Sequence, residues 1–141
     1  MPQPTLRRGG GWRPELSARI LLVEDEFLVR LILAEALVDA GFCVVQADKG
    51  GEAVRILDGS SGFELMITDV QMPGPPDGIG VARHARARFA QMPIIFATAR
   101  PDSIRAFGER SRRDAVVQKP YGPEQMLRVV RRILDAPPSR P

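Results

Sequence analysis

Five short apolar runs alternate with helix-length segments through the middle of this chain. The runs cover residues 19–23, 42–46, 63–68, 93–97 and 115–118. The segments between and after them, 27–40, 51–57, 79–89, 102–110 and 123–134, have the length or the apolar spacing of helices. Short, continuously apolar strands that alternate with helices are typical of a parallel sheet covered on both faces. The pattern therefore predicts an α/β fold with five parallel strands.

The two ends of the chain differ from this body in composition. Residues 1–17 hold three prolines and the run Gly9–Gly11, which predicts a flexible N-terminal arm. Residues 136–141 hold three prolines and cannot continue a helix, so they form a Pro-rich tail. We expect one ordered domain at 18–135 and no attached output domain.

Charge and rare residues exclude several classes of function. The net charge is +3, but the two ends supply all of it and the 118 residues between them are neutral. A neutral body argues against a nucleic-acid-binding face. One cysteine and one histidine exclude a disulfide framework and Cys- or His-rich metal sites. The chain has no long apolar run and no signal-peptide pattern, so we expect no membrane span and a cytoplasmic location.

Polar side chains that can bind ions or take part in reactions follow four of the five apolar runs. Glu24 and Asp25 follow the first, Asp69 the third, Thr98 the fourth and Lys119 the fifth. Because parallel strands point the same way, their carboxyl ends meet at one edge, where open α/β sheets bind ligands. We therefore expect these five residues to share one pocket.

Three crowded carboxylates raise one another's pKa unless a cation joins them. Mg²⁺ suits such oxygen ligands, since it binds one or two carboxylates together with water and phosphate oxygens. One carboxylate would remain free as a nucleophile. Thr98 could then donate a hydrogen bond to a phosphoryl oxygen, and Lys119 could pair first with Asp69 and later with the phosphoryl group. The set predicts a site that accepts a phosphoryl group.

Four motifs in order resemble the receiver domain of two-component response regulators. They read Ile-Leu-Leu-Val-Glu-Asp-Glu at 20–26, Ile-Thr-Asp-Val-Gln-Met-Pro-Gly at 67–74, Phe-Ala-Thr-Ala at 96–99 and Gln-Lys-Pro-Tyr at 118–121. The resemblance covers residues 18–135. It implies a doubly wound, flavodoxin-like sheet of strand order 2-1-3-4-5. The Phe-Ala-Thr triplet is similar to that of a subgroup of stand-alone receivers, although Ala99-Arg100 departs from its pattern.

The resemblance also implies a role for each site residue. Asp69 would be the phosphoacceptor, assisted by Thr98 and Lys119. Asp25 would bind Mg²⁺ directly, Glu24 through water, and the Gln71 backbone carbonyl would complete the protein ligands with Asp69. Pro120 would hold the lysine inward through a cis bond.

The implied partners follow from the same resemblance. A sensor histidine kinase or histidine phosphotransferase would donate the phosphoryl group, and a downstream protein would respond. The chain would be no true enzyme, since it would catalyse only its own Mg²⁺-dependent phosphorylation and dephosphorylation. It would bind neither nucleic acid nor membrane and would be a monomer or weak dimer.

One departure leaves a second class of function open. Most receivers carry an aromatic residue three positions before the lysine, and here that position is Val116. Either the aromatic switch is missing, or Tyr121 or Phe107 replaces it. The alternative function is a receiver-like interaction module that never takes a phosphoryl group. The intact set of five residues argues against that alternative.

Three further positions and one segment carry expectations. Gln71 and Arg100 flank the pocket, where they either tune the attack of water on the acyl phosphate or are merely solvated loop residues. The segment 27–40 carries more apolar residues than one buried stripe needs, so part of it is expected to dock a kinase or phosphotransferase rather than form a permanent dimer. Cys43 is expected to be a small, buried strand residue.

Overall fold

The computed structural model describes residues 17–108 and 110–135. The elements in chain order are β1 (Arg19–Val23), α1 (Phe27–Asp39), β2 (Cys43–Ala47), α2 (Gly50–Asp58), β3 (Leu65–Asp69), α3 (Gly78–Arg88), β4 (Ile94–Thr98), η2 (Pro101–Ala106), β5 (Ala115–Gln118) and α4 (Pro123–Asp135). The predicted arm at 1–17 and tail at 136–141 fall almost entirely outside the described residues, so both stay predictions, as do the domain boundaries.

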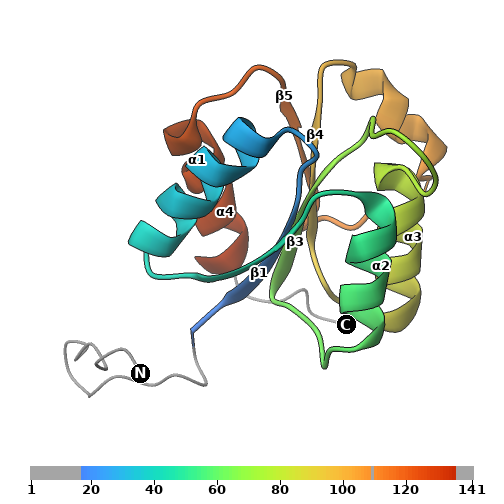
Figure 1. Cartoon of the computed structure of the whole chain (residues 1–141), viewed down its shortest axis with the longest axis horizontal. Helices are drawn as coiled ribbons and strands as arrows, with labels where there is room; N and C mark the ends of the chain where they lie inside the picture. The colour runs from blue at the N-terminus through green and yellow to red at the C-terminus, as the bar shows by residue number, and fades with distance from the viewer. Residues whose placement is uncertain (1–16, 109, 136–141) are drawn as a thin grey trace.

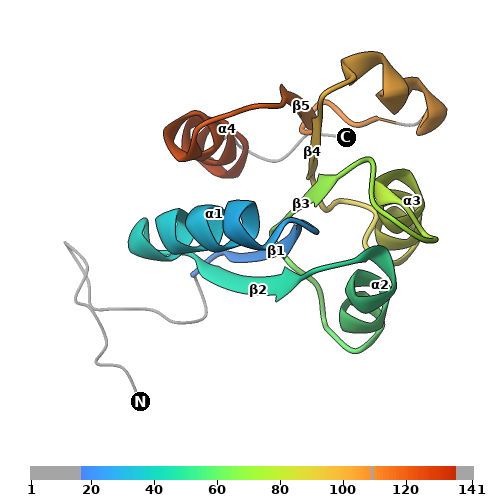
Figure 2. The same ribbon diagram turned by 45° about the horizontal axis from the view of Figure 1, so that its top comes forward.

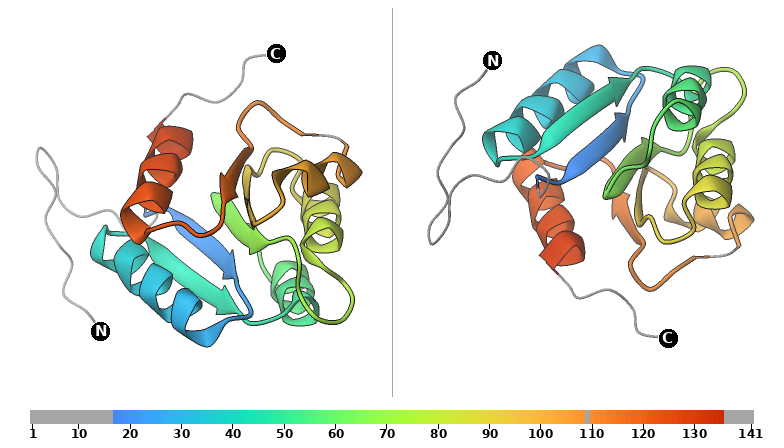
Figure 3. Two further views of the ribbon diagram at one scale, coloured as in Figure 1. Left: turned by 90° about the horizontal axis from the view of Figure 1, so that it is seen from above. Right: turned by 90° about the horizontal axis from the view of Figure 1, so that it is seen from below.

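The five strands form one parallel sheet of order β2-β1-β3-β4-β5 (Figure 1). This confirms the predicted fold class and strand order. Helices α1 and α4 cover one face, and α2 and α3, with η2 beside them, cover the other (Figure 2). The views from above and below show the same two layers of helices, one on each side of the sheet (Figure 3). In the described part of the chain, no helix combines the length and the apolar character that crossing a membrane requires.

Two hydrophobic cores lie on opposite faces of this sheet. Alternate residues of β1 divide between them, with Ile20 and Leu22 facing α1 and α4, and Leu21 and Val23 facing α2 and α3. All four side chains are almost completely buried. The continuous apolar run of β1 therefore has a simple cause, since a central parallel strand must supply apolar side chains to both faces.

A glycine at the start of α3 lets this helix approach the end of β3. A Cβ atom on Gly78 would lie 1.7 Å from the backbone oxygen of Asp69. Asp77 caps the same helix, because its side chain accepts a hydrogen bond of 3.0 Å from the backbone N–H of Gly80. The position of Asp69 thus depends on the absence of a side chain at residue 78.

Two expectations about local structure are wrong. The helix expected at 102–110 is a 3₁₀ segment, η2, of only six residues, followed by Gly108 with φ of +82°. A left-handed glycine ends a helix, which leaves the segment no length for further turns. Cys43 is exposed rather than buried, because it begins β2, the strand at the edge of the sheet.

Helix α1 presents a large apolar surface away from the cores. Its buried residues are Leu33, Ala34 and Leu37. Five other large apolar side chains have exposed fractions between 37% and 66%: Phe27, Leu28, Leu31, Ile32 and Val38. We call these five residues the α1 apolar face.

Candidate metal and phosphoryl-acceptor site

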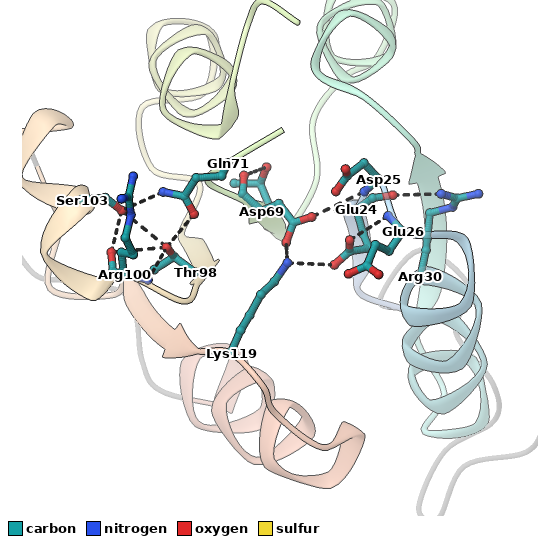
Figure 4. A network of polar contacts seen from close by, with 11 residues as sticks. Glu24, Asp25, Glu26, Arg30, Asp69, Gln71, Thr98, Arg100, Ser103 and Lys119 are labelled. Atoms are coloured by element: carbon teal, nitrogen blue, oxygen red, sulfur yellow. Dashed lines mark hydrogen bonds and ion pairs between the residues drawn. The ribbon is translucent and has the colours of Figure 1, made fainter. Parts of the chain in front are cut away.

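The three predicted carboxylates meet at the carboxyl edge of the sheet. Glu24 and Asp25 follow β1, and Asp69 ends the neighbouring strand β3. Each offers a carboxylate oxygen, and these oxygens lie within 4.8 Å of one another. The backbone N–H of Asp25 also points to Oδ2 of Asp69 at 3.5 Å. Figure 4 shows the three side chains converging from the two strands.

Asp69 is buried in this cluster, with only 1% of its surface exposed. Burial, together with the neighbouring carboxyl groups of Glu24 and Asp25, raises the pKa of Asp69 to about 8, while Lys119 opposes the change. A buried carboxyl beside two others favours its neutral form until positive charge is supplied.

Glu24 is also buried, and its position is fixed by its own loop. Its Oε2 accepts a hydrogen bond of 2.9 Å from the backbone N–H of Glu26. Its backbone carbonyl accepts one of 2.9 Å from Arg30 Nη1. Arg30 in turn donates to Gln46 on β2, so the first turn of α1 holds the acidic loop against the sheet edge.

Among the described residues, Lys119 is the one positive side chain that forms ion pairs with these carboxylates. Its Nζ lies 2.5 Å from Oδ1 of Asp69 and 3.7 Å from Oε1 of Glu24. Burial lowers the pKa of Lys119, but attraction to Asp69, Glu24 and Asp25 outweighs it, so the pKa is raised. The following Lys119–Pro120 peptide bond is cis, as the resemblance implies.

The donor set fits Mg²⁺. All ligands offered are hard carboxylate oxygens from three side chains, which is the chemistry that Mg²⁺ prefers in proteins. One ammonium group for three carboxylates leaves negative charge that a divalent cation would neutralise. Asp25 is the most accessible of the three, since Glu24 and Asp69 are buried.

Thr98 ends β4, next to β3 in the sheet, and its side chain is turned toward Gln71 rather than Asp69 (Figure 4). Its Oγ1 donates a hydrogen bond of 2.8 Å to Oε1 of Gln71. Gln71 Nε2 donates to Oγ of Ser103 at 3.2 Å. The Gln71 side chain thus joins the site, which favours a functional interpretation of that position over simple solvation. Sequence reasoning missed Ser103, because nothing local to 101–106 distinguishes this serine from a loop residue.

The two aromatic candidates for the missing switch residue lie on opposite faces of the sheet. Phe107 is buried against Phe96, with ring centroids 5.2 Å apart, in the core against which Val116 packs. Tyr121 packs on the other core, beside α1 and α4. Phe107 is therefore the aromatic residue on the side of Val116.

Comparison with known proteins agrees with this geometry. A family model for the response regulator receiver domain matches residues 20–131. The chain belongs to the response regulator receiver domain family, whose members are signalling phosphoacceptors that work with histidine kinases. The acidic cluster is like the magnesium site of that domain.

Individual proteins of this family are similar to the chain in sequence and in structure. Protein PetR of Rhodobacter capsulatus is 33% identical over 121 residues, which cover 85% of this chain and 50% of PetR. The chain spans about half the length of the curated relatives it matches. A response regulator receiver protein from Sinorhizobium medicae has a similar structure, with 29% identity, a TM-score of 0.78, and coverage of 86% of this chain and 98% of that one.

A more distant structure shares the fold. The receiver domain of a sensor histidine kinase from Pseudomonas aeruginosa is 24% identical, with a TM-score of 0.73 and coverage of 85% of this chain and 99% of that one. That structure has a magnesium ion coordinated in its active-site cleft.

Proposed function

We propose that this chain is a response regulator that accepts a phosphoryl group onto Asp69 from a phosphohistidine of a histidine kinase or histidine phosphotransferase. One observation carries the proposal: Asp69 is buried among two further carboxylates while a lysine ammonium lies 2.5 Å from its Oδ1. Negative charge is concentrated at a point where a cation and a phosphoryl group would relieve it.

The proposed transfer is an in-line displacement. A carboxylate oxygen of Asp69 attacks phosphorus, and the P–N bond of the donor breaks with its electron pair left on the histidine ring nitrogen. Mg²⁺, held by Asp25, Asp69 and the Gln71 backbone carbonyl and reached by Glu24 through water, would supply positive charge to the transferring group. Hydrolysis of the resulting acyl phosphate would return Asp69 to its carboxylate form.

Lys119 and Thr98 are proposed to detect the phosphoryl group. Lys119 pairs with Asp69 at rest, and a phosphoryl oxygen on Asp69 would offer it a more strongly charged partner. Thr98 would donate its hydroxyl hydrogen to another phosphoryl oxygen. Since Thr98 ends β4 and Lys119 follows β5, their movement would change the surface formed by η2, β5 and α4.

A downstream protein in the cytoplasm would bind that changed surface. The phosphoryl group could also pass onward, or the chain could act as a phosphate sink. The neutral body between residues 18 and 135 gives no support to nucleic-acid binding.

The N-terminal half of the α1 apolar face, formed by Phe27, Leu28, Leu31 and Ile32, is the proposed docking surface for the phosphoryl donor. Phe27 and Leu28 are exposed and follow the acidic loop directly, so a helix packed on them would stand beside Asp69. Exposed apolar patches of this kind mark protein contacts. A monomer that binds its donor transiently explains this patch without a permanent dimer.

Charge on the N-terminal half of this face should slow phosphotransfer from a protein donor. Leu28→Glu is expected to reduce the rate about tenfold, because it buries a carboxylate in an apolar interface. The measurement uses radiolabelled kinases or phosphotransferases that phosphorylate the wild-type chain. Val38→Glu is the matched control, since Val38 is similarly exposed but lies about 15 Å further along the helix. Equal slowing by both variants, or slowed transfer from acetyl phosphate, would contradict a local docking role.

Intact-mass analysis after incubation with acetyl phosphate tests the proposed function. We expect gain of one phosphoryl group with Mg²⁺, none without Mg²⁺, and none in Asp69→Asn. Asp102→Asn, which changes an exposed aspartate on η2, should behave as wild type. No gain under any condition, from acetyl phosphate or from kinases, would instead favour the interaction module that Val116 suggested.

A further inference from the structure

The Thr98 hydroxyl belongs to a closed ring of hydrogen bonds (Figure 4). The backbone N–H of Arg100 donates to Thr98 Oγ1 at 3.0 Å, and Thr98 Oγ1 donates to Gln71 Oε1 at 2.8 Å. Gln71 Nε2 then donates to Ser103 Oγ at 3.2 Å, and Ser103 Oγ donates to the backbone carbonyl of Arg100 at 2.7 Å. The ring thus begins at the backbone N–H of Arg100 and ends at the backbone carbonyl of the same residue.

Counting hydrogens fixes the direction of every bond in this ring. Ser103 has one hydroxyl hydrogen and gives it to the Arg100 carbonyl, so Ser103 must accept from Gln71. The amide nitrogen of Gln71 therefore faces Ser103, and its oxygen faces Thr98. The two alternative acceptors for Thr98 are more distant: the Arg100 carbonyl at 3.3 Å, which already accepts from Ser103, and Ser103 Oγ at 3.5 Å, which already accepts from Gln71.

The only hydrogen of the Thr98 hydroxyl is thus engaged at rest. Thr98 is completely buried, so water does not offer its hydroxyl an equal replacement. To donate to a phosphoryl oxygen on Asp69, Thr98 must first leave Gln71. The ring also spans three elements, since Gln71 follows β3, Thr98 ends β4 and Ser103 lies in η2.

We propose that Gln71 is a positioning residue that latches Thr98 in its resting orientation, and that Ser103 anchors this latch by orienting the Gln71 amide. The strength of the latch sets how readily a phosphoryl group on Asp69 switches the β4–η2 segment. This inference rests on the proposed function, because it assigns a resting partner to Thr98, the residue proposed to hydrogen-bond the phosphoryl group.

Binding of beryllium trifluoride, a non-covalent phosphoryl mimic, measures the switch. The titration uses the full chain at saturating Mg²⁺, so that changes in metal affinity do not enter. Gln71→Leu keeps the backbone carbonyl and removes both amide partners. It should bind the mimic about threefold to tenfold more tightly, the factor expected for one lost resting hydrogen bond. Ser103→Ala should act in the same direction, and the control Ser61→Ala, an exposed serine away from the site, should not change binding.

A double-mutant cycle separates the latch from a merely structural role. Adding Ser103→Ala to Gln71→Leu should bring no further change, because Ser103 acts through Gln71. In a Thr98→Val background, which lacks the latched hydroxyl, Gln71→Leu should have no effect. A gain of the same size in that background would show that Gln71 acts without Thr98 and would overturn the latch.

The remaining outcomes distinguish the two proposals. If the wild-type chain binds the mimic while both single variants bind with equal or lower affinity, the latch is wrong and the proposed function stands. If the wild-type chain does not bind the mimic with Mg²⁺, the proposed function is wrong and the latch fails with it.

Discussion

We expect the affinity of this chain for Mg²⁺ to weaken by up to about tenfold for each unit that the pH falls below 8. The cause is the burial of Asp69 among Glu24 and Asp25, which raises its pKa to about 8 in the metal-free chain. A cation that uses the Asp69 carboxylate must displace one proton at neutral pH. Between about pH 8, where half of the Asp69 carboxyl is ionised, and pH 6, the affinity should therefore fall about 50-fold.

The same shift fixes the sign of the stability change with pH. The pKa of Asp69 is raised from an ordinary value of 3.8, so the folded chain binds this proton more tightly than the unfolded chain. The resulting stabilisation is present below about pH 4 and is lost as the pH rises through about 8. Added Mg²⁺ should reverse this trend, because it stabilises the ionised carboxylate in the folded chain.

Calorimetric titration of Mg²⁺ at several pH values tests this prediction. Buffers with different ionisation enthalpies should report about one proton released per ion near neutral pH. Asp69→Asn removes the titrating group, so its weaker Mg²⁺ binding should lose most of the pH dependence. Constant wild-type affinity between about pH 6 and pH 8 would contradict the raised pKa.

Strand-end chemistry explains why so much of the acidic cluster could be predicted. Glu24 and Asp69 are local signals, since each directly follows a run of apolar residues that can only be a buried strand. Parallel strands then bring their ends together whatever the detailed packing. The strand order depended on the family resemblance, because alternation alone does not say which strand neighbours which.

The incorrect expectation for Cys43 concerns information that is not local. Cys43 follows Phe42 in an apolar run, and such a run looks the same in an edge strand and a central strand. Exposure of Cys43 comes from the position of β2 at the sheet edge, which long-range pairing decides. Ser103 could not be singled out for the same reason, since its partner Gln71 lies 32 residues earlier.

Asp114 is another residue whose importance lies in distant contacts. Its side chain is fully buried and accepts hydrogen bonds from Arg86 Nη2 at 2.7 and 2.9 Å. It also accepts from the backbone N–H groups of Ile94 at 2.9 Å and Ser111 at 2.8 Å. One carboxylate thus joins α3, the start of β4 and the loop before β5.

Asp114→Ala should destabilise the chain by about 3–5 kcal/mol, the largest stability change we expect from one substitution. The variant leaves the mostly buried Arg86 guanidinium without this carboxylate and two backbone N–H groups without their acceptor. The free energy of unfolding of a small domain is about 5–15 kcal/mol. The loss should therefore appear as a large fall in the urea concentration at the unfolding midpoint.

Matched substitutions separate the network from the general effect of removing an aspartate. Asp114→Asn should fall between wild type and Asp114→Ala, because an amide oxygen still accepts hydrogen bonds but carries no charge for Arg86. Asp39→Ala removes an exposed carboxylate at the last residue of α1, where negative charge opposes the helix dipole, so it should leave stability unchanged or slightly higher. A loss below about 1 kcal/mol in Asp114→Ala would mean that Arg86 and the two N–H groups find other partners.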